Sequence, residues 1–199
     1  MKYFLVKKCM NLIKNKQPHL TSEDLEKIEY GLAGVYLSAT KLIVIAIVAM
    51  MLGQLKETLF FVLIYALIKT HSYGVHATKS WICLISSILI FIPIPWIAMR
   101  AEIPFLIKYI VGAISTIMIF KNSPADTYKR PIINKQKRLK HKLLATLTAL
   151  IFIIFSVLIT NHFIANCFIL AILLQSLISS PVVYSIFKLP FNNYLRYSS

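Results

Sequence analysis

The sequence predicts an all-α, polytopic membrane protein. Hydrophobic residues make up 58% of its 199 residues, charged residues make up only 15%, and the mean hydropathy is +0.72. A soluble domain usually has about 25% charged and about 45–50% apolar residues. Apolar runs of about 20 residues recur, and this length crosses a hydrocarbon core about 30 Å thick. We therefore expect about six hydrophobic helices in a single integral membrane domain, 1–199, with an N-terminal amphipathic helical region at the membrane surface.

Residues 1–30 mix apolar and basic side chains, as Phe4 and Lys7 illustrate. A basic helix with one apolar face lies on an anionic membrane surface rather than crossing it. Pro18 interrupts the pattern, and the TSED sequence at 21–24 has its acids where a first helical turn favours them. A second short helix is expected to lead from there into the membrane.

Six hydrophobic segments follow this interfacial region. They are approximately Leu32–Leu52, Thr58–Ile68, Trp81–Ala98, Ile103–Phe120, Leu143–Thr160 and Phe163–Ser180. The second segment is short for a full crossing, because Glu57 and Lys69 flank it closely. Pro93 and Pro95 are expected to kink or end the third helix, because proline lacks the backbone N–H and its ring clashes with the preceding turn.

The distribution of Lys and Arg predicts a multi-pass protein of the cell membrane with both termini in the cytoplasm. With six crossings, eighteen of the 22 basic residues fall on the cytoplasmic side and two on the outer side. Cytoplasmic connectors carry such an excess. Membrane helices would occupy 31–186, followed by a cytoplasmic tail, 187–199. The net charge of +15 is explained by topology and by anionic lipid headgroups, and it implies no nucleic acid.

Titratable residues concentrate in Lys69–Cys83, which the orientation places on the cytoplasmic side. This stretch holds two histidines, a glycine and a cysteine between two apolar segments. Such residues at the mouth of a membrane segment are candidates for function. A nucleophilic cysteine needs thiolate character, which a neighbouring histidine, a positive charge or a helix N-terminus supplies. If Ser80 caps the third helix, Cys83 lies in its first turn, and His76 is the candidate base.

The spacing of His76 and Cys83 imposes a geometric condition. In an unbroken helix, seven residues separate two side chains by about 10 Å along the axis. Proton transfer needs direct hydrogen-bond reach or one bridging water. His76 must therefore lie in a loop that folds back over the helix start, and Gly74 supplies the conformational freedom for this turn. From composition alone, a packing role for the cysteine is the stronger interpretation.

The GVHA motif, with a cysteine seven residues after its histidine, resembles the accessory gene regulator protein B (AgrB) family. The similarity extends to the chain length, the KLIV start of the first segment and the SPADTYKRPI connector. The resemblance implies a membrane cysteine endopeptidase of quorum sensing and virulence regulation. Such an enzyme cuts the C-terminal part from an AgrD-type precursor peptide and holds the remainder as a thioester. The peptide's internal cysteine then closes a thiolactone ring.

The resemblance assigns the nucleophile to Cys83, the histidine of the site to His76 and the loop glycine to Gly74. The family's basic residue before this loop is usually arginine and corresponds here to Lys69. Lysine keeps the charge but lacks the two-pronged hydrogen bonding of a guanidinium. None of the seven acidic residues lies near the motif in sequence, so no third catalytic residue is predicted.

The densest basic loop begins with Lys129 and Arg130. The first interpretation is that these basic residues keep the loop on the cytoplasmic side of the membrane. The second is that they dock an acidic segment of a precursor peptide, because charge attraction orients a partner. A small non-enzymatic transporter or channel is the alternative function, although only Lys41 and Lys108 are candidate intramembrane charges. We expect no metal or other cofactor, and homo-oligomer formation is left open.

Overall fold

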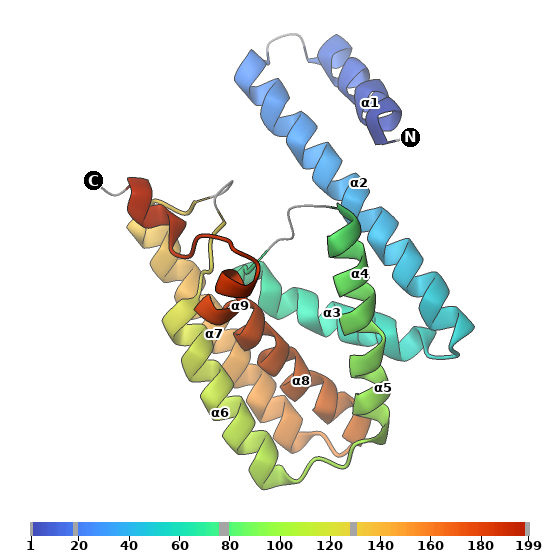
Figure 1. Cartoon of the computed structure of the whole chain (residues 1–199), viewed down its shortest axis with the longest axis vertical. Coiled ribbons are helices and arrows are strands. Elements are labelled where there is room, and N and C mark those ends of the chain that lie inside the picture. The colour runs from blue at the N-terminus through green and yellow to red at the C-terminus, as the bar shows by residue number, and fades with distance from the viewer. Residues whose placement is uncertain (1, 18–19, 76–79, 128–130, 198–199) are drawn as a thin grey trace. The chain divides into compact units, whose positions relative to one another are not determined.

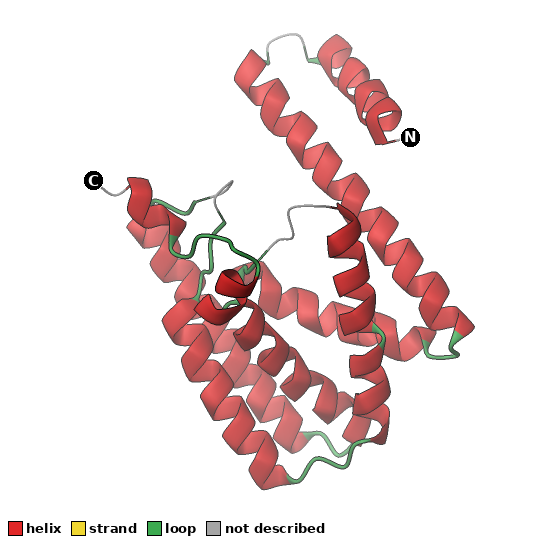
Figure 2. Ribbon diagram, in the orientation of Figure 1, coloured by secondary structure: helices red, strands yellow, loops and turns green. Residues whose placement is uncertain are grey.

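The computed structural model describes residues 2–17, 20–75, 80–127 and 131–197, and all regular elements in these ranges are helices (Figure 1, Figure 2). The predicted all-α class is confirmed. The chain divides into two compact units, Met1–Val48 and Ala49–Ser199.

The first unit contains α1 (Lys2–Lys16) and most of α2 (Ser22–Met51). Thr21 and Asp24 cap the start of α2 reciprocally. Thr21 Oγ1 accepts from Asp24 N–H at 3.2 Å, and Asp24 Oδ2 accepts from Thr21 N–H at 3.3 Å. The predicted helix start is thus present, but the helix runs without a break to Met51 rather than beginning as a separate short helix. The position of α1 on a membrane surface stays a prediction.

The second unit is a bundle of helices. Its elements are α3 (Leu55–Ser72), α4 (Ser80–Phe91), α5 (Pro93–Arg100), α6 (Phe105–Asn122), α7 (Lys135–Leu158), α8 (His162–Ile178), α9 (Pro181–Ile186) and the 3₁₀ helix η1 (Asn193–Tyr197). Helices α7 and α8 each pack against both α3 and α6, and α5 packs on α8 (Figure 1). Helix α8 is therefore surrounded by other helices, which explains why its apolar residues are mostly buried.

Close packing holds α6 against α7 and α8. Gly112 of α6 is buried, and a Cβ added to it would come within 2.8 Å of Ile153 and 3.1 Å of Ile169. A hydrogen at this position lets the three helices approach closely, as small residues do in membrane bundles.

The prolines divide the third hydrophobic segment as predicted. Helix α4 ends at Phe91, and α5 begins at Pro93, where the missing N–H of proline is tolerated. Gln54 lies beside the break, and its Nε2 donates to Ile92 O at 2.9 Å. The break is therefore held by a side-chain hydrogen bond from the start of α3.

Four segments of the described chain are long and apolar enough to cross a membrane by length and composition. They are Ser22–Met51, Trp81–Arg100, Phe105–Asn122 and Lys135–Leu158. Helix α8 is apolar but has 17 residues, and α3 carries Lys56, Glu57 and Lys69 within its 18. These helices suggest a multi-pass membrane protein, whereas six crossings stay a prediction.

Candidate active site

Segments that are distant in sequence meet at one end of the second unit. Gly74 N–H donates to Ala125 O, and Ala125 N–H donates to Ser72 O, both at 3.0 Å. These two bonds join the turn after α3 to the connection between α6 and α7 as a parallel bridge. Val75 N–H reaches Ile178 O at 3.5 Å and so adds the end of α8. The turn thus lies at the same end of the bundle as the connection that leads into the basic start of α7.

Gly74 occupies a conformation and a space that suit only glycine. Its φ is +135°, a region that residues with a Cβ rarely adopt. The residue is buried, and an added Cβ would lie 2.7 Å from Ile178 Cγ2. Both the backbone and the neighbouring helix therefore exclude a larger residue.

We expect Gly74→Ala to lower the free energy of unfolding by about 2–4 kcal/mol, because positive-φ strain adds about 1–2 kcal/mol to the overpacking against α8. The measurement is thermal unfolding of the detergent-solubilised chain. Gly53→Ala is the matched control, since Gly53 also has a positive φ of 70° but nothing lies within 4 Å of its added Cβ. Equal destabilisation by the two substitutions would contradict the steric part of the explanation.

Cys83 lies in the first turn of α4, at the fourth residue of the helix. Its side chain is half-buried and carries a thiol that is not part of a disulfide. The hydroxyls of Ser86 and Ser87 donate to its backbone carbonyl at 3.2 and 2.7 Å. Gly74 and Val75 are not helical, so no continuous helix runs from Gly74 to Cys83. The geometric condition on His76 and Cys83 stays a prediction, because His76 lies outside the described residues.

Three of the predicted site residues, His76, Lys129 and Arg130, lie outside the described residues. Lys69 is described, in the last turn of α3. Its carbonyl accepts from Tyr73 N–H at 3.0 Å, and its ammonium lies 5.3 Å from the centroid of the Tyr65 ring. Lys69 therefore supports the start of the turn through its backbone.

Asp126 follows the bridge and anchors the C-terminal segment. Its Oδ1 accepts from Asn193 N–H at 3.1 Å, and its Oδ2 accepts from Tyr194 N–H at 3.0 Å. Oδ2 also lies 3.5 Å from Arg138 Nη1, and the Arg138 guanidinium stacks on the Tyr194 ring. The side chain of Asp126 is only 1% exposed. Residues 181–197, whose last part was expected as a tail, are therefore folded onto this end of the bundle.

Tyr184 adds a further link between α9 and the bridge. Its hydroxyl donates to Ala125 O at 3.1 Å and to Asp126 O at 2.9 Å. Burial, and then the charge of Asp126, raises the pKa of Tyr184, so the hydroxyl remains a donor well above neutral pH. The bridge is thus held from α3, α8 and α9 together.

Tyr73 connects the turn to α7 and α8. Its hydroxyl lies 3.4 Å from His141 Nε2, and the His141 ring lies 5.8 Å from that of His71, centroid to centroid. The Tyr73 carbonyl accepts from Gln175 Nε2 of α8 at 2.7 Å. Both ends of this residue are therefore held by neighbouring helices.

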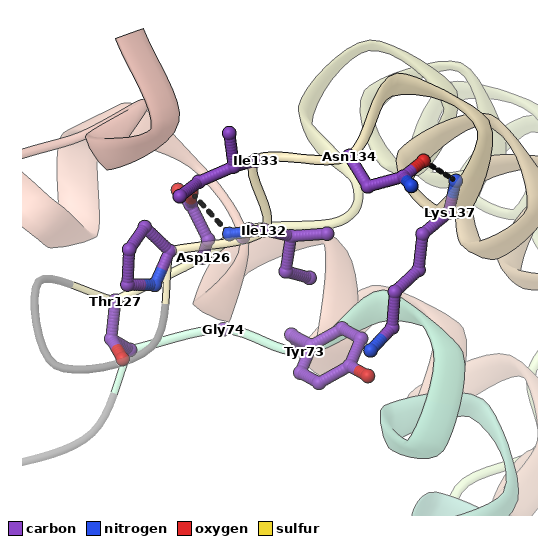
Figure 3. A pocket seen from close by; sticks show the side chains of 10 residues that line it. Tyr73, Gly74, Asp126, Thr127, Ile132, Ile133, Asn134 and Lys137 are labelled. Atoms are coloured by element: carbon purple, nitrogen blue, oxygen red, sulfur yellow. Dashed lines mark hydrogen bonds between the residues drawn. The ribbon is translucent and has the colours of Figure 1, made fainter. Parts of the chain in front are cut away.

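A cavity of about 500 Å³ opens beside the turn (Figure 3). Its lining comes from residues 73–74, 125–127 and 131–134 and from Lys137 of α7. The volume lies within the range of about 300–1,000 Å³ that is typical of ligand sites. The Lys137 side chain extends toward Tyr73 in Figure 3, so a cation lies beside the apolar part of this cavity.

The sequence interpretation missed Asp126 and Gln175. It placed no acid near the motif, but folding brings Asp126 next to Gly74 at the wall of the cavity. An aspartate within SPADTYKRPI, whose other charged residues are Lys129 and Arg130, was the available signal. A glutamine in a long apolar run was the corresponding signal for Gln175, since polar residues are costly there.

A family model described as Accessory gene regulator B matches residues 6–179. The chain belongs to the AgrB family. This membership confirms the resemblance carried by GVHA and the spaced cysteine. The family acts in quorum-sensing accessory gene regulation, and membership in it implies a role in peptide processing.

Relatives from staphylococci are similar over most of the chain. The Accessory gene regulator protein B of Staphylococcus haemolyticus is 30% identical over 86% of this chain and 88% of its own length. The protein of the same name from Staphylococcus carnosus is 34% identical over 69% of this chain and 71% of its own length. The one from Staphylococcus saprophyticus is 29% identical over 91% of this chain and 96% of its own length. No solved structure matches the chain.

Proposed function

We propose that the chain is an integral membrane cysteine endopeptidase that cleaves an AgrD-type precursor peptide and promotes thiolactone cyclisation of the product. The observation that best supports this proposal is the half-buried thiol of Cys83 in the first turn of α4, in a chain of the AgrB family. The free backbone N–H groups of a helix start favour negative charge that develops beside them during a reaction. His76 follows the fixed turn at Gly74 by two residues in sequence, and it is the base that we propose for this thiol.

The reaction proceeds in two acyl transfers. His76 takes the thiol proton, and the Cys83 sulfur attacks the scissile carbonyl carbon. The C–N bond breaks, the imidazolium protonates the leaving amine, and the upstream part of the precursor remains on sulfur as a thioester. The precursor's own cysteine then gives its proton to His76 and attacks the thioester carbonyl. A thiolactone forms, and the Cys83 thiol is regenerated.

The thioester explains why ring closure needs no ATP. It retains the acyl activation of the intermediate, provided that water is kept away from it. A site at a membrane interface is partly dry and can receive an amphipathic peptide that lies in the lipid surface. Exclusion of water thus favours cyclisation over hydrolysis.

Basic residues around the turn support binding of the precursor. Lys129 and Arg130 precede the cavity-lining residue Pro131 in sequence, and Lys137 lines the cavity itself. These cations attract an acidic part of the precursor and orient it toward the turn. The same charges favour the cytoplasmic side for this end of the bundle and for both termini.

Co-expression of the full chain with its cognate precursor tests the proposal. Mass spectrometry should detect the released C-terminal fragment, the cyclic product and an adduct on Cys83 equal to the upstream fragment minus one water. An intact precursor in membranes that contain the folded chain would overturn the proposal and favour a non-enzymatic role such as transport.

We expect His76→Ala to lower the rate of precursor cleavage by at least about 100-fold, the usual contribution of a positioned base. The rate is measured on purified chain reconstituted in lipid. His162→Ala is the control, because His162 is exposed at the start of α8. Retained cleavage in His76→Ala would remove this histidine from the mechanism.

A further inference from the structure

Gln175 is an amide side chain buried in an apolar helix. It lies in the last turn of α8, within the run AILLQSLI, and none of its surface is exposed. Burial of an amide is unfavourable unless hydrogen bonds replace those it made with water. A leucine would fit the composition of α8 without this requirement, so the hydrogen bonds of Gln175 must explain why an amide stands here.

The donor half of the amide holds the turn after α3. Gln175 Nε2 donates to Tyr73 O at 2.7 Å, across 102 positions of sequence. Tyr73 has a φ of +59°, and Gly74 has a φ of +135°. The peptide plane between these two residues with left-handed backbone is therefore held at both ends, by Gln175 at its carbonyl and by Ala125 O at the Gly74 N–H. Gln175 provides the only one of these two bonds that comes from a side chain. His76 follows this plane by two residues in sequence.

The acceptor half of the amide argues against a purely structural role. Gln175 Oε1 is buried and has no hydrogen-bond partner among the described residues. An unpaired buried acceptor destabilises the fold by an amount similar to what one hydrogen bond contributes. The bond that Nε2 makes to Tyr73 O is therefore the contact of this side chain that the described residues account for, and it holds the turn.

Gln54 provides a comparison within the same unit. It is 3% exposed, and its Nε2 also donates to a backbone carbonyl, Ile92 O, at 2.9 Å. This bond lies at the break between α4 and α5, away from the turn after α3. The two glutamines thus share their burial and a bond from the side-chain amide to a backbone carbonyl. They differ in the segment that this bond holds: the break between α4 and α5 for Gln54, and the turn after α3 for Gln175.

We propose that Gln175 is a positioning residue for the thiol chemistry of Cys83. It orients the peptide plane between Tyr73 and Gly74, which precedes the proposed base His76 by two residues in sequence. The inference rests on the proposed function. A reacting group misplaced by about 1 Å loses about 100-fold in rate, so this one bond has a large influence on turnover and a small one on folding.

The test compares Gln175→Leu with Gln54→Leu in the full chain reconstituted in lipid. The folded fraction of each variant is determined by gel filtration, so that kcat refers to folded sites only. We expect Gln175→Leu to lower kcat per site by about 10- to 100-fold with KM unchanged. Gln54→Leu should leave kcat per site within about twofold of the wild-type value, because misfolding lowers only the number of sites.

Gln175→Met is the second variant, should the leucine disturb folding, because it keeps the length of glutamine but has no donor. A wild-type kcat per site in either Gln175 variant, or an equal fall in Gln54→Leu, overturns the inference. Failure of the proposed function gives a different result: the wild-type chain leaves the precursor intact, or a chain with Cys83→Ala still cuts it.

Discussion

Cleavage of the precursor is expected to fall by at least about three orders of magnitude, to below detection, when Cys83 is replaced by alanine. The substitution removes the only sulfur in α4 and leaves a good helix former in its first turn, so the bundle should still assemble. The measurement is a time course of precursor cleavage by the reconstituted chain, with the folded fraction determined by gel filtration.

Cys9→Ala is the matched control, because Cys9 is exposed on α1 and has no place in the mechanism. It should cleave at the wild-type rate and form the same adduct on Cys83. Substantial cleavage by Cys83→Ala would exclude the thioester mechanism and leave the chain with another catalytic group or another role.

Asp126→Ala is expected to lower the free energy of unfolding by about 3–5 kcal/mol, the usual consequence of removing one partner from a buried ion pair. It leaves Arg138, whose side chain is 17% exposed, without its carboxylate. It also removes the acceptors of two backbone N–H groups in η1, those of Asn193 and Tyr194. The C-terminal segment should then detach and become sensitive to protease.

Thermal unfolding and limited proteolysis in detergent measure these two effects. Glu102→Ala is the control, since Glu102 is an exposed acid in the short connection between α5 and α6. A protected C-terminus in Asp126→Ala would mean that Tyr184 and the remaining contacts are sufficient to hold this segment.

The helices were predictable because their signals are local. The TSED sequence predicted the start of α2, and Pro93 predicted the break before α5, since capping and the proline ring act within one turn. The continuity of α2 was not predicted, because the change from polar to apolar residues near Gly31 resembles a boundary. Helix α2 nevertheless continues through this change without a break.

The site was predictable only in part, because its pieces come from distant parts of the sequence. The GVHA motif and the cysteine seven residues after its histidine identify candidate residues within one continuous segment, Lys69–Cys83. The bonds of Gly74 to Ala125, and of Tyr73 to Gln175, join segments that no local pattern connects. Their pairing depends on how α3, α6 and α8 pack, and packing is a property of the whole bundle.

The bond between Gln175 and Tyr73 also has a consequence for biogenesis. Membrane proteins are made from the N-terminus, and domains form as their elements emerge. The sequence of α3 and α4 is complete long before α8 is synthesised, because 102 residues separate the two bonded positions. A nascent or truncated chain without α8 therefore lacks the bond that Gln175 makes to the turn. Under the proposed function, we expect full reactivity of Cys83 only after the last long helix has been inserted.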